Sequence, residues 1–440
     1  MQTQTTCVAD EIRKVARAAR RAGKHYTGLG PESRSAILRA WATALRQADI
    51  RSEVMAANAR DMAAAREAQA RGELDEARVR RLALAPSKLD SLCAGLEQLA
   101  DAPDLLAAPT LTRDLDEGLT LVRQPCPLGT LGIVFEARPD AVVQIAGLAF
   151  KTANGLLLKG GSEALHSNRA LTAVLHRVLV SHGVETAGIA LLEQREEISA
   201  MLACEDVIDL VIARGSGAFV SYIQANTKIP VMGHAEGLCH MVLHGAYEPA
   251  LAAKMVVDAK CSYPAACNAV ETLLWTPGAE QALAATVAAL QVQGVELRGC
   301  PTTLQIHGDL KPATADDWAL EYGSFVLAIR QVPDLDAALA HIEHYGSRHT
   351  EALVSEDAAA AERFLAEVDA ACVFHNASTR FADGYRFGLG AEVGISTGKL
   401  HARGPVGVEG LLTYRWLMRG QGQASSDYGP GKRPFLHRER

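Results

Sequence analysis

The feature that constrains the fold most is an alternation of short apolar runs and helical stretches that begins at Pro127. Four runs in the first series have the length of strands, at residues 131–135, 155–158, 189–192 and 207–213. A second series starts after about His240, with runs at 241–243, 270–275, 295–297, 303–306, 325–329, 352–354 and 372–374. Because strand–helix repetition builds parallel sheets covered by helices on both faces, the sequence predicts two α/β domains in series.

The segments outside this alternation follow other patterns. The first hundred residues carry apolar side chains at helical spacing, among them Ile37, Leu38 and Trp41, which predicts helices. Residues 110–124 place leucines among polar residues and a glycine, which predicts a β-hairpin. No periodicity is visible in residues 421–440, so we expect them to form a loose tail.

Composition and charge exclude several classes of protein. Lys and Arg number 44 and Asp and Glu number 51, so the net charge is −7, which leaves no basic field to hold a nucleic acid. The nine cysteines are scattered without a Cys-x-x-Cys pair. This pattern predicts a reducing compartment rather than a disulfide framework or a zinc site. No secretory signal or long apolar segment is visible, so we expect a cytoplasmic protein without a membrane partner.

Two predicted strand-to-helix turns, at residues 156–163 and 211–217, are rich in small residues. Small residues let backbone N–H groups and a helix N-terminus approach an anion closely. The carboxyl ends of parallel strands are also where α/β proteins bind nucleotides. The second turn departs from the Gly-x-Gly-x-x-Gly pattern because Val220 stands at its third glycine. Simple tight turns are the alternative interpretation.

Cys267 lies in a loop between a predicted helix and a predicted strand, next to Asn268. Such a thiol has access to substrate and nearby backbone donors for a developing oxyanion, which is typical of a nucleophile. From position alone, a buried structural cysteine is the stronger interpretation. Neighbouring side chains on an extended segment point to opposite faces, so we reject a metal site at His234, Cys239 and His240.

Three polar, glycine-rich segments lie late in the chain, at residues 375–380, 387–392 and 400–405. They carry Asn, Ser, His and Arg side chains. Because arginine binds a carboxylate or a phosphate through its forked guanidinium, these loops are candidates for substrate recognition. Solvated turns are the alternative interpretation.

Six segments, in the same order along the chain, together resemble the γ-glutamyl phosphate reductase family of the aldehyde dehydrogenase superfamily. They are PLGTLGIVFEARPD, LKGGSEALHSN, YPAACNAVETLL, VFHNASTRF, FGLGAEVGIST and LHARGPVGVEGLLTY. The resemblance extends from about Leu121 to Arg419, with looser similarity in the N-terminal helices. Six ordered segments are far more specific than a single glycine motif.

The resemblance implies an aldehyde-dehydrogenase-like α/β fold with two Rossmann-like parallel-sheet domains and a small β flap. We expect a cofactor-binding domain at residues 1–109 and 125–236 and a catalytic domain at residues 237–385. An oligomerisation flap is expected at residues 110–124 and 408–420, so the resemblance also implies a homo-oligomer, either a dimer or a tetramer.

The implied activity is the NADPH-dependent reduction of L-glutamyl 5-phosphate to L-glutamate 5-semialdehyde and phosphate. It proceeds through a cysteine thioester and is the second step of proline biosynthesis. No kinase-like segment precedes the reductase region, so we expect a separate glutamate 5-kinase, and the labile acyl phosphate favours a transient complex with it. Two alternatives stay open: oxidation of another semialdehyde to its acid, and a non-catalytic paralogue that serves as a binding partner.

The resemblance also assigns roles to individual residues. Cys267 matches the family nucleophile. The matches in the cofactor site are Lys159, Gly161 and Ser162 in the turn at the adenosine ribose, Gly215 and Ser216 beside the pyrophosphate, and Glu321 at the nicotinamide ribose. Ser162 stands where NAD-preferring aldehyde dehydrogenases commonly carry Glu, so it leaves room for the 2′-phosphate of NADP, and Lys159 adds positive charge.

The resemblance also indicates a substrate site and two differences from the oxidising aldehyde dehydrogenases. The candidates for substrate binding are Arg138, Asn376, Arg380 and Arg403, and no metal ligands are expected. The general-base Glu of the oxidising aldehyde dehydrogenases falls at His234, and their oxyanion Asn falls near Arg138. A reductase that must protect its thioester from water gains by lacking that base.

Overall fold

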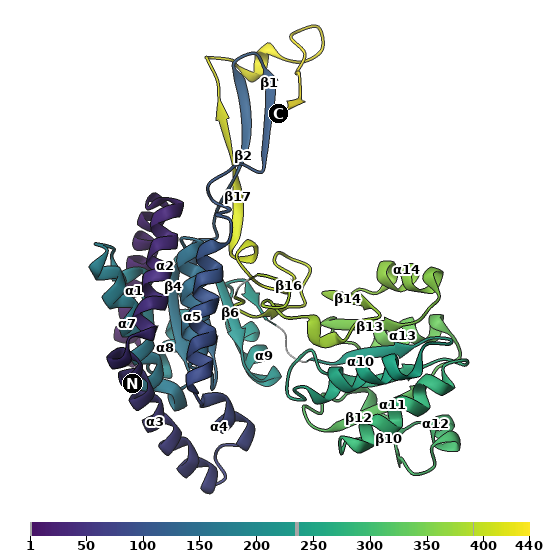
Figure 1. Cartoon of the computed structure of the whole chain (residues 1–440). Helices are drawn as coiled ribbons and strands as arrows, with labels where there is room; N and C mark the ends of the chain where they lie inside the picture. The colour runs from purple at the N-terminus through teal and green to yellow at the C-terminus, as the bar shows by residue number, and fades with distance from the viewer. Residues whose placement is uncertain (1, 234–236, 390) are drawn as a thin grey trace.

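The computed structural model describes residues 2–233, 237–389 and 391–440. Figure 1 shows two α/β lobes side by side, with a narrow arm that rises from the first lobe and carries the C-terminus. Each lobe is built on a parallel sheet, and the arm is a small antiparallel sheet. These features confirm the predicted α/β fold with two parallel-sheet domains and a small β element.

The first lobe is built on a five-stranded sheet with the order β5-β4-β3-β6-β7, in which all neighbours are parallel. Its strands are β3 (Thr130–Phe135), β4 (Gly155–Gly160), β5 (Ile189–Leu192), β6 (Leu210–Arg214) and β7 (Val231–Met232). The chain builds outward from β3 to β5 and then returns to place β6 on the other side of β3. Such a reversal leaves a crevice at the carboxyl ends of the two central strands, where doubly wound α/β proteins bind ligands.

Alternate residues of these strands face opposite sides of the sheet, and each side has its own helices. Ile133 packs toward α2 (Gly30–Arg46), α5 (Pro86–Asp101), α6 (Asp140–Lys151) and α7 (Leu165–Ser181). Val134 packs toward α1 (Gln2–Gly28), α8 (Glu196–Leu202) and α9 (Gly217–Ala225). Helices α3 (Ala48–Ala70) and α4 (Glu76–Leu82) extend from the lobe and pack under the turns that follow β3 and β4. All residues of β3 and β4 are buried, as covering on both faces requires.

The second lobe is built on a seven-stranded parallel sheet with the order β11-β10-β12-β9-β8-β13-β14. Its strands are β8 (Cys239–Leu243), β9 (Val270–Trp275), β10 (Glu296–Gly299), β11 (Lys311–Pro312), β12 (Val326–Gln331), β13 (Thr350–Val354) and β14 (Cys372–His375). Helices α10 (Pro249–Cys261) and α11 (Glu280–Val292) cover one face, and α13 (Leu335–Tyr345) and α14 (Ala358–Glu367) cover the other. The amino ends of β12, β9, β8 and β13 therefore lie in a row at one edge.

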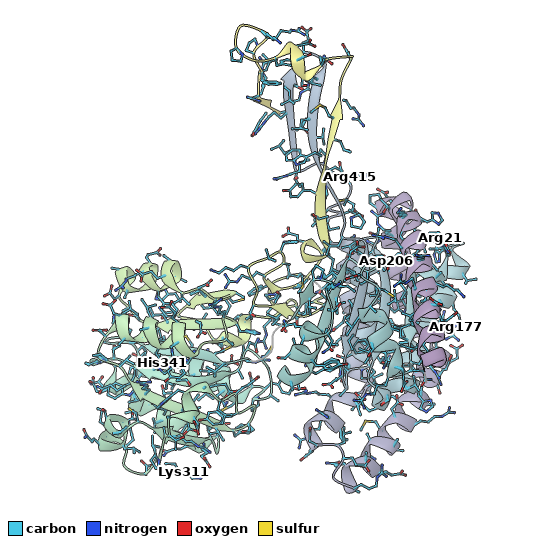
Figure 2. All side chains as sticks on the ribbon, turned by 180° about the vertical axis from the view of Figure 1, so that it is seen from behind. Arg21, Arg177, Asp206, Lys311, His341 and Arg415 are labelled. Carbon is cyan, nitrogen blue, oxygen red and sulfur yellow. The ribbon has the colours of Figure 1, made fainter. Side chains whose placement is uncertain are left out.

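The arm is a four-stranded sheet with the order β17-β2-β1-β18. Strands β1 (Leu111–Asp116) and β2 (Leu119–Pro127) form the hairpin that the sequence predicts, with Gly118 in the left-handed region at φ 70° between them. Strand β17 (Leu412–Arg419) pairs with β2 from Leu412 to Arg419. Figure 2 labels Arg415 where this strand leaves the lobe.

The last twenty residues differ from the loose tail that the sequence predicts. They contain a 3-10 turn at Ser425–Asp427 and the short strand β18 (Arg438–Glu439), which pairs with β1. The Tyr428 hydroxyl donates a hydrogen bond to Asp116 Oδ2 at 2.8 Å. Contacts between residues this distant in the chain leave no local periodicity, so the sequence pattern does not reveal them.

One predicted strand is wrong. Residues 303–306 belong to the helix α12 (Pro301–Ile306). Pro301 suits a first helical turn because its fixed φ is already helical, and the Trp275 indole N–H donates to Thr303 Oγ1 at 3.0 Å. A short apolar run does not by itself separate a strand from a buried helix.

The described residues contain neither a helix that could span a membrane nor a disulfide. Although α1 has 27 residues, no described helix combines the length and the apolar content that crossing a bilayer requires. None of the eight cysteines whose side chains are described is in a disulfide. Cys93 and Cys204 pack in the apolar cores, where burial raises the pKa of each thiol.

An ion pair is buried where α10 meets β9. Lys260 Nζ lies 2.6 Å from Glu271 Oε2, and neither side chain is more than 1% exposed. Burial raises the pKa of Glu271 and lowers the pKa of Lys260, and each partner opposes the shift of the other. Glu271 Oε1 also accepts the Gly323 N–H at 3.2 Å, so the pair holds the loop that precedes β12.

Replacing Glu271 with Gln is expected to lower the free energy of unfolding by about 3–5 kcal/mol, because Lys260 is left buried without a counter-charge. Urea titration followed by circular dichroism measures the loss. The control is Glu296→Gln, which removes a surface partner of Lys311 and should cost no more than about 1 kcal/mol. Equal stability of the two variants would contradict the structural role of the buried pair.

Candidate active site

A cavity of about 540 Å³ is lined by residues of both lobes. Its charged lining residues are Arg78, Arg81, Arg138, Arg214, Arg380, Glu136, Glu321, Asp383 and Glu392. Cys267 lines the same cavity. A concave site with convergent charged groups of both signs is suited to a polar, anionic ligand.

The carboxyl edge of the first sheet forms one wall of this cavity. Phe135, the last residue of β3, pairs with Gly160 of β4 on one side and with Arg214 of β6 on the other. The turns that follow these three strands therefore begin side by side. Arg138 lies in the turn after β3, and Arg214 ends β6.

Hydrogen bonds between side chains and backbone join these turns to one another. The Ser216 N–H donates to Glu136 Oε2 at 3.3 Å, and the Ala137 N–H donates to Glu163 Oε1 at 2.6 Å. Ala137 has φ 46°, in the left-handed region that residues with a side chain seldom adopt. Such backbone strain persists where the surroundings hold it and is common at functional sites.

The amino edge of the second sheet forms the opposite wall. Cys267 lies in the loop before β9, Glu321 lies before β12, and His349 directly precedes β13. Gly237 lies before β8, the strand between β9 and β13. Because parallel strands begin at the same edge of a sheet, segments more than 80 residues apart meet at Cys267.

Cys267 is half-buried, and its backbone is closely supported. Its Sγ lies 3.2 Å from His349 Nε2. The thiol of Cys239 donates to the Cys267 carbonyl oxygen at 3.3 Å. Gly237 packs so closely that an added Cβ would lie 2.2 Å from the same oxygen. The position of Cys267 thus depends on a neighbour without a side chain.

Arg380 is fixed beside Cys267 by its partners on the second lobe. Its Nη1 donates to Asn268 Oδ1, and its Nε donates to Ser262 Oγ at 3.2 Å. Asn268 in turn donates to the Ala382 carbonyl oxygen at 2.8 Å. Burial lowers the pKa of Arg380, and Cys267 is among the groups that oppose this shift.

Arg214 and Glu392 form a loose pair within the cavity. Arg214 Nη2 lies 4.0 Å from Glu392 Oε1, and their side chains are 15% and 19% exposed. Burial lowers the pKa of Arg214 and raises that of Glu392. Arg214 Nη1 is buried without a hydrogen-bond partner among the described residues. A buried donor left in this state favours the binding of an anion.

Glu321 lines the cavity at the start of a loop with two buried anchors. The Gly323 N–H donates to Glu271 at 3.2 Å, and the Tyr322 hydroxyl donates to Asp317 Oδ1 at 2.7 Å. The loop is therefore held from inside the second lobe, while Glu321 faces the cavity.

The turn after β4 extends the same sheet edge beyond β3. Lys159 is buried and its Nζ donates to the Gly160 carbonyl oxygen at 2.5 Å. Burial lowers the pKa of Lys159, and neighbouring carboxylates, with Glu163 first, oppose this shift. Ser162 is exposed at the start of a 3-10 turn, and a side chain at Gly161 would displace the Glu163 carboxylate. This turn has an exposed hydroxyl and a buried ammonium group.

Two predicted substrate residues make other contacts. Asn376 Nδ2 donates to the Ser355 carbonyl oxygen at 3.0 Å, and Asn376 Oδ1 accepts the Ser355 N–H at 3.0 Å. Arg403 pairs with Asp369 at 2.8 Å. Within the described residues, neither Asn376 nor Arg403 lines the cavity that contains Cys267.

The segment that we rejected as a metal site is described only in part. His234 lies outside the described residues. His240 Nδ1 lies 3.0 Å from Glu351 Oε2 inside the second sheet, and Cys239 supports Cys267. In the described ranges, no group of three or more His, Cys, Asp or Glu is arranged to hold a metal ion.

Sequence analysis did not select His349 or Arg214 as site residues. His349 lies in no recognisable motif. What could have indicated it is its position directly before a strand that begins at the same sheet edge as the strand after Cys267. The order of the strands must be known before that position can be recognised. Arg214 stands in the small-residue turn at 211–217, but only the strand pairing places it opposite Phe135.

A nicotinamide dinucleotide fits the residues present at this edge. The crevice lies at the carboxyl ends of β3 and β6, where the topology favours such ligands. Gly215 and Ser216 line the cavity and lead into α9, and the start of a helix suits the binding of a pyrophosphate. The unpartnered Nη1 of Arg214 adds a buried donor for an anion, and Glu321 supplies a carboxylate acceptor from the facing lobe.

Comparisons with known proteins agree on one family. The chain is 52% identical over 425 residues to a γ-glutamyl phosphate reductase of Synechococcus sp. (strain JA-2-3B'a(2-13)), covering 96% of this chain and 93% of that protein. The crystal structure of γ-glutamyl phosphate reductase from Thermotoga maritima is similar with a TM-score of 0.88 and 33% identity, covering 94% of this chain and 99% of that chain. No family model matches the chain.

More distant structures share the fold. An acetylating aldehyde dehydrogenase from Geobacillus thermoglucosidasius is similar with a TM-score of 0.68 and 16% identity, covering 96% of this chain and 99% of that chain. An engineered glycolyl-CoA reductase with bound NADP+ is similar with a TM-score of 0.65 and 13% identity, covering 92% of this chain and 96% of that chain. These likenesses show an aldehyde-dehydrogenase-like fold.

Gly237→Ala is expected to lower the turnover of the enzyme about 10²-fold, because the new Cβ displaces the Cys267 backbone and a misplacement of about 1 Å costs that much. The matched control is Gly308→Ala, whose Cβ would lie 3.6 Å from the Leu304 carbonyl oxygen in ordinary contact. Steady-state kinetics and thermal melting of both variants measure the effect. Wild-type turnover in Gly237→Ala would contradict the close support of Cys267.

Proposed function

The chain belongs to the γ-glutamyl phosphate reductase family, and from this we propose that it catalyses the NADPH-dependent reduction of L-glutamyl 5-phosphate to L-glutamate 5-semialdehyde and phosphate. This is the second step of proline biosynthesis. The observation that carries the proposal is Cys267 in a cavity lined by Arg138, Arg214 and Arg380. A thiol beside several guanidinium groups suits a reaction in which a sulfur nucleophile meets an anionic acyl phosphate.

Cys267 is the proposed nucleophile. Its Sγ attacks the acyl carbon, the C–S bond forms, the bond to the phosphate oxygen breaks, and a thioester remains on Cys267. NADPH, when bound, supplies the hydride that reduces the thioester to a thiohemiacetal. Collapse of the thiohemiacetal breaks the C–S bond and releases the semialdehyde. The half-buried position of Cys267 supports a thioester protected from water.

The arginines of the cavity are the proposed substrate-binding groups. The substrate carries a carboxylate at one end and a phosphate at the other, and guanidinium groups bind both through forked hydrogen bonds. Arg138 and Arg380 come from the sequence prediction, and the unpartnered Nη1 of Arg214 supports adding that residue. Asn376 and Arg403 stay predictions without a role in this cavity.

NADPH is the proposed cofactor. We assign its adenosine ribose to Lys159, Gly161 and Ser162, its pyrophosphate to Gly215 and Ser216, and its nicotinamide ribose to Glu321. The exposed Ser162 leaves space for a 2′-phosphate, and one structural neighbour, the engineered glycolyl-CoA reductase, has NADP+ bound. Lys159 supplies positive charge close to that position.

The arm is the proposed contact between protomers in a dimer or a tetramer. Tyr414 and Trp416 of β17 are 54% and 51% exposed, and exposed aromatic side chains favour interfaces. We also propose a cytoplasmic location, because Cys267 needs a reducing environment to stay a thiol. A transient complex with glutamate 5-kinase would carry the labile acyl phosphate to this site.

Cys267→Ala is expected to lose at least about 10³-fold in turnover, because no other group supplies the covalent intermediate. The assay follows NADPH formation at 340 nm from the semialdehyde, NADP+ and inorganic phosphate under anaerobic conditions. The control is Cys261→Ala, a half-buried thiol six residues earlier at the end of α10.

Three outcomes separate the proposed function from its alternatives. Turnover that requires phosphate supports the reductase. Turnover without phosphate indicates a dehydrogenase that releases a free acid. Binding of NADPH without turnover, or the absence of both, indicates a non-catalytic paralogue. Retained activity in Cys267→Ala would contradict the assignment of the nucleophile.

Ser162→Glu is expected to lower kcat/KM for NADPH at least about tenfold relative to NADH, since a carboxylate at this position repels the 2′-phosphate. The variant Ser162→Ala, which removes only the hydroxyl and adds no charge, serves as the control and should keep the wild-type ratio. Steady-state kinetics with both cofactors measure the two ratios. An unchanged ratio in Ser162→Glu would contradict the assignment of the adenosine ribose to this turn.

A further inference from the structure

His349 is a fully buried histidine whose ring contacts the sulfur of Cys267. Its Nε2 lies 3.2 Å from Cys267 Sγ, and its Nδ1 lies 2.8 Å from Thr350 Oγ1. We propose that His349 is a catalytic residue that takes the thiol proton from Cys267 and returns it when the cycle ends. This inference rests on the proposed thioester chemistry and adds the group that makes the thiolate.

The backbone at His349 is joined to the segment that supports Cys267. The Ser347 N–H donates to the Leu238 carbonyl oxygen at 3.3 Å, and the Leu238 N–H donates to Ser347 Oγ at 2.9 Å. Leu238 follows Gly237, which packs against the Cys267 backbone. Arg348 has φ 61°, in the left-handed region. The Arg348 carbonyl oxygen accepts the Ala371 N–H at 2.9 Å, and such a strained residue next to His349 is common where geometry serves function.

The contact with Thr350 suits the proton-accepting form of the ring. For Nε2 to accept the thiol proton, neutral His349 must carry its own proton on Nδ1. In that form Nδ1–H donates to Thr350 Oγ1, which accepts at 2.8 Å. Both residues are 0% exposed, so solvent does not compete for this hydrogen bond. A threonine hydroxyl can accept as well as donate, so this contact supports the form whose Nε2 accepts the thiol proton.

Protons and electrons balance through the cycle. The S–H bond of Cys267 breaks and an N–H bond forms at Nε2, which leaves a thiolate beside an imidazolium. The thiolate attacks the acyl carbon, and the electron pair of the broken C–O bond leaves with the phosphate, which takes one proton from solvent. After hydride addition, collapse of the alkoxide expels the sulfur as a thiolate. The thiolate then takes back the proton from Nε2, so the thiol and neutral His349 are restored.

Other titratable groups approach Cys267 from different elements. Among the described residues, Arg214, Cys239, Arg380 and Glu392 interact with it electrostatically. Glu392 already accepts the Gly384 N–H at 2.7 Å and faces Arg214. The arginines carry fixed positive charge that favours a thiolate but do not accept a proton. His349 differs from these groups because its Nε2 contacts Sγ and can accept a proton.

Alkylation of Cys267 across a range of pH tests this role without substrate or cofactor. The thiolate is the reactive form, so the rate with iodoacetamide follows its population. We compare full-length wild type with His349→Gln and quantify the modified Cys267 peptide by mass spectrometry. The profile of His349→Gln should move to higher pH by about one unit or more, which lowers the rate at pH 7 about tenfold.

Two further variants make the result specific. His341→Gln is the matched control, because His341, labelled in the second lobe in Figure 2, is a buried histidine of the same lobe. Its ring packs edge-on against that of His240. The profile of His341→Gln should superimpose on that of wild type. Thr350→Val keeps the shape of its residue and removes the partner of Nδ1, so it should shift the profile in the same direction by a smaller amount. It also provides the test if His349→Gln does not fold.

The outcomes separate this inference from the proposed function. If the profile of His349→Gln superimposes on that of wild type, the role of His349 is overturned. If His349→Gln does not fold, the same result with Thr350→Val overturns it. A shifted profile in a protein that lacks phosphate-dependent turnover would support His349 and overturn the proposed function. If the profile of the variant matches that of wild type and phosphate-dependent turnover is full, the proposed function is supported and the role of His349 is overturned.

Discussion

The direction of parallel strands decides where the chemistry of this protein lies. In such a sheet all carboxyl ends meet at one edge and all amino ends at the other. The first lobe turns its carboxyl edge toward the cavity, and the second lobe turns its amino edge toward it. Arg138 and Arg214 come from the first edge, and Cys267 and Glu321 come from the second. The cavity is therefore lined by residues of both lobes, and the proposed nucleophile and the proposed dinucleotide crevice come from different lobes.

Burial gives the charged groups of this cavity their chemical character. Burial lowers the pKa of Arg214 and raises that of Glu392, which lie 4.0 Å apart. A guanidinium with an unpartnered N–H in such surroundings gains most when an anion arrives, since electrostatic interactions strengthen as water is excluded. The buried pair of Lys260 and Glu271 lies outside the cavity but affects it, because the pair fixes the loop that carries Glu321.

The sequence predicts most of the strands better than it predicts which side chains surround the cavity. Apolar runs such as residues 270–275 coincide with a strand because a strand buried on both faces must be apolar along its length. Residues 303–306 are too short for the same pattern to separate a strand from the helix α12. The positions of His349 and Arg214 beside the cavity follow only from the order of the strands. The ordered position of Tyr428 follows only from its contact with Asp116.

The proposed covalent step at Cys267 is the central claim about this site, and a trapping experiment tests it most directly. The full-length protein is incubated with L-glutamate 5-semialdehyde and NADP+ in the absence of phosphate, and its peptides are analysed by mass spectrometry. The thioester has no phosphate to release it, so the Cys267 peptide should gain the mass of one glutamyl group, and later addition of phosphate should remove it. A protein that oxidises the semialdehyde while the Cys267 peptide stays unmodified would contradict the mechanism.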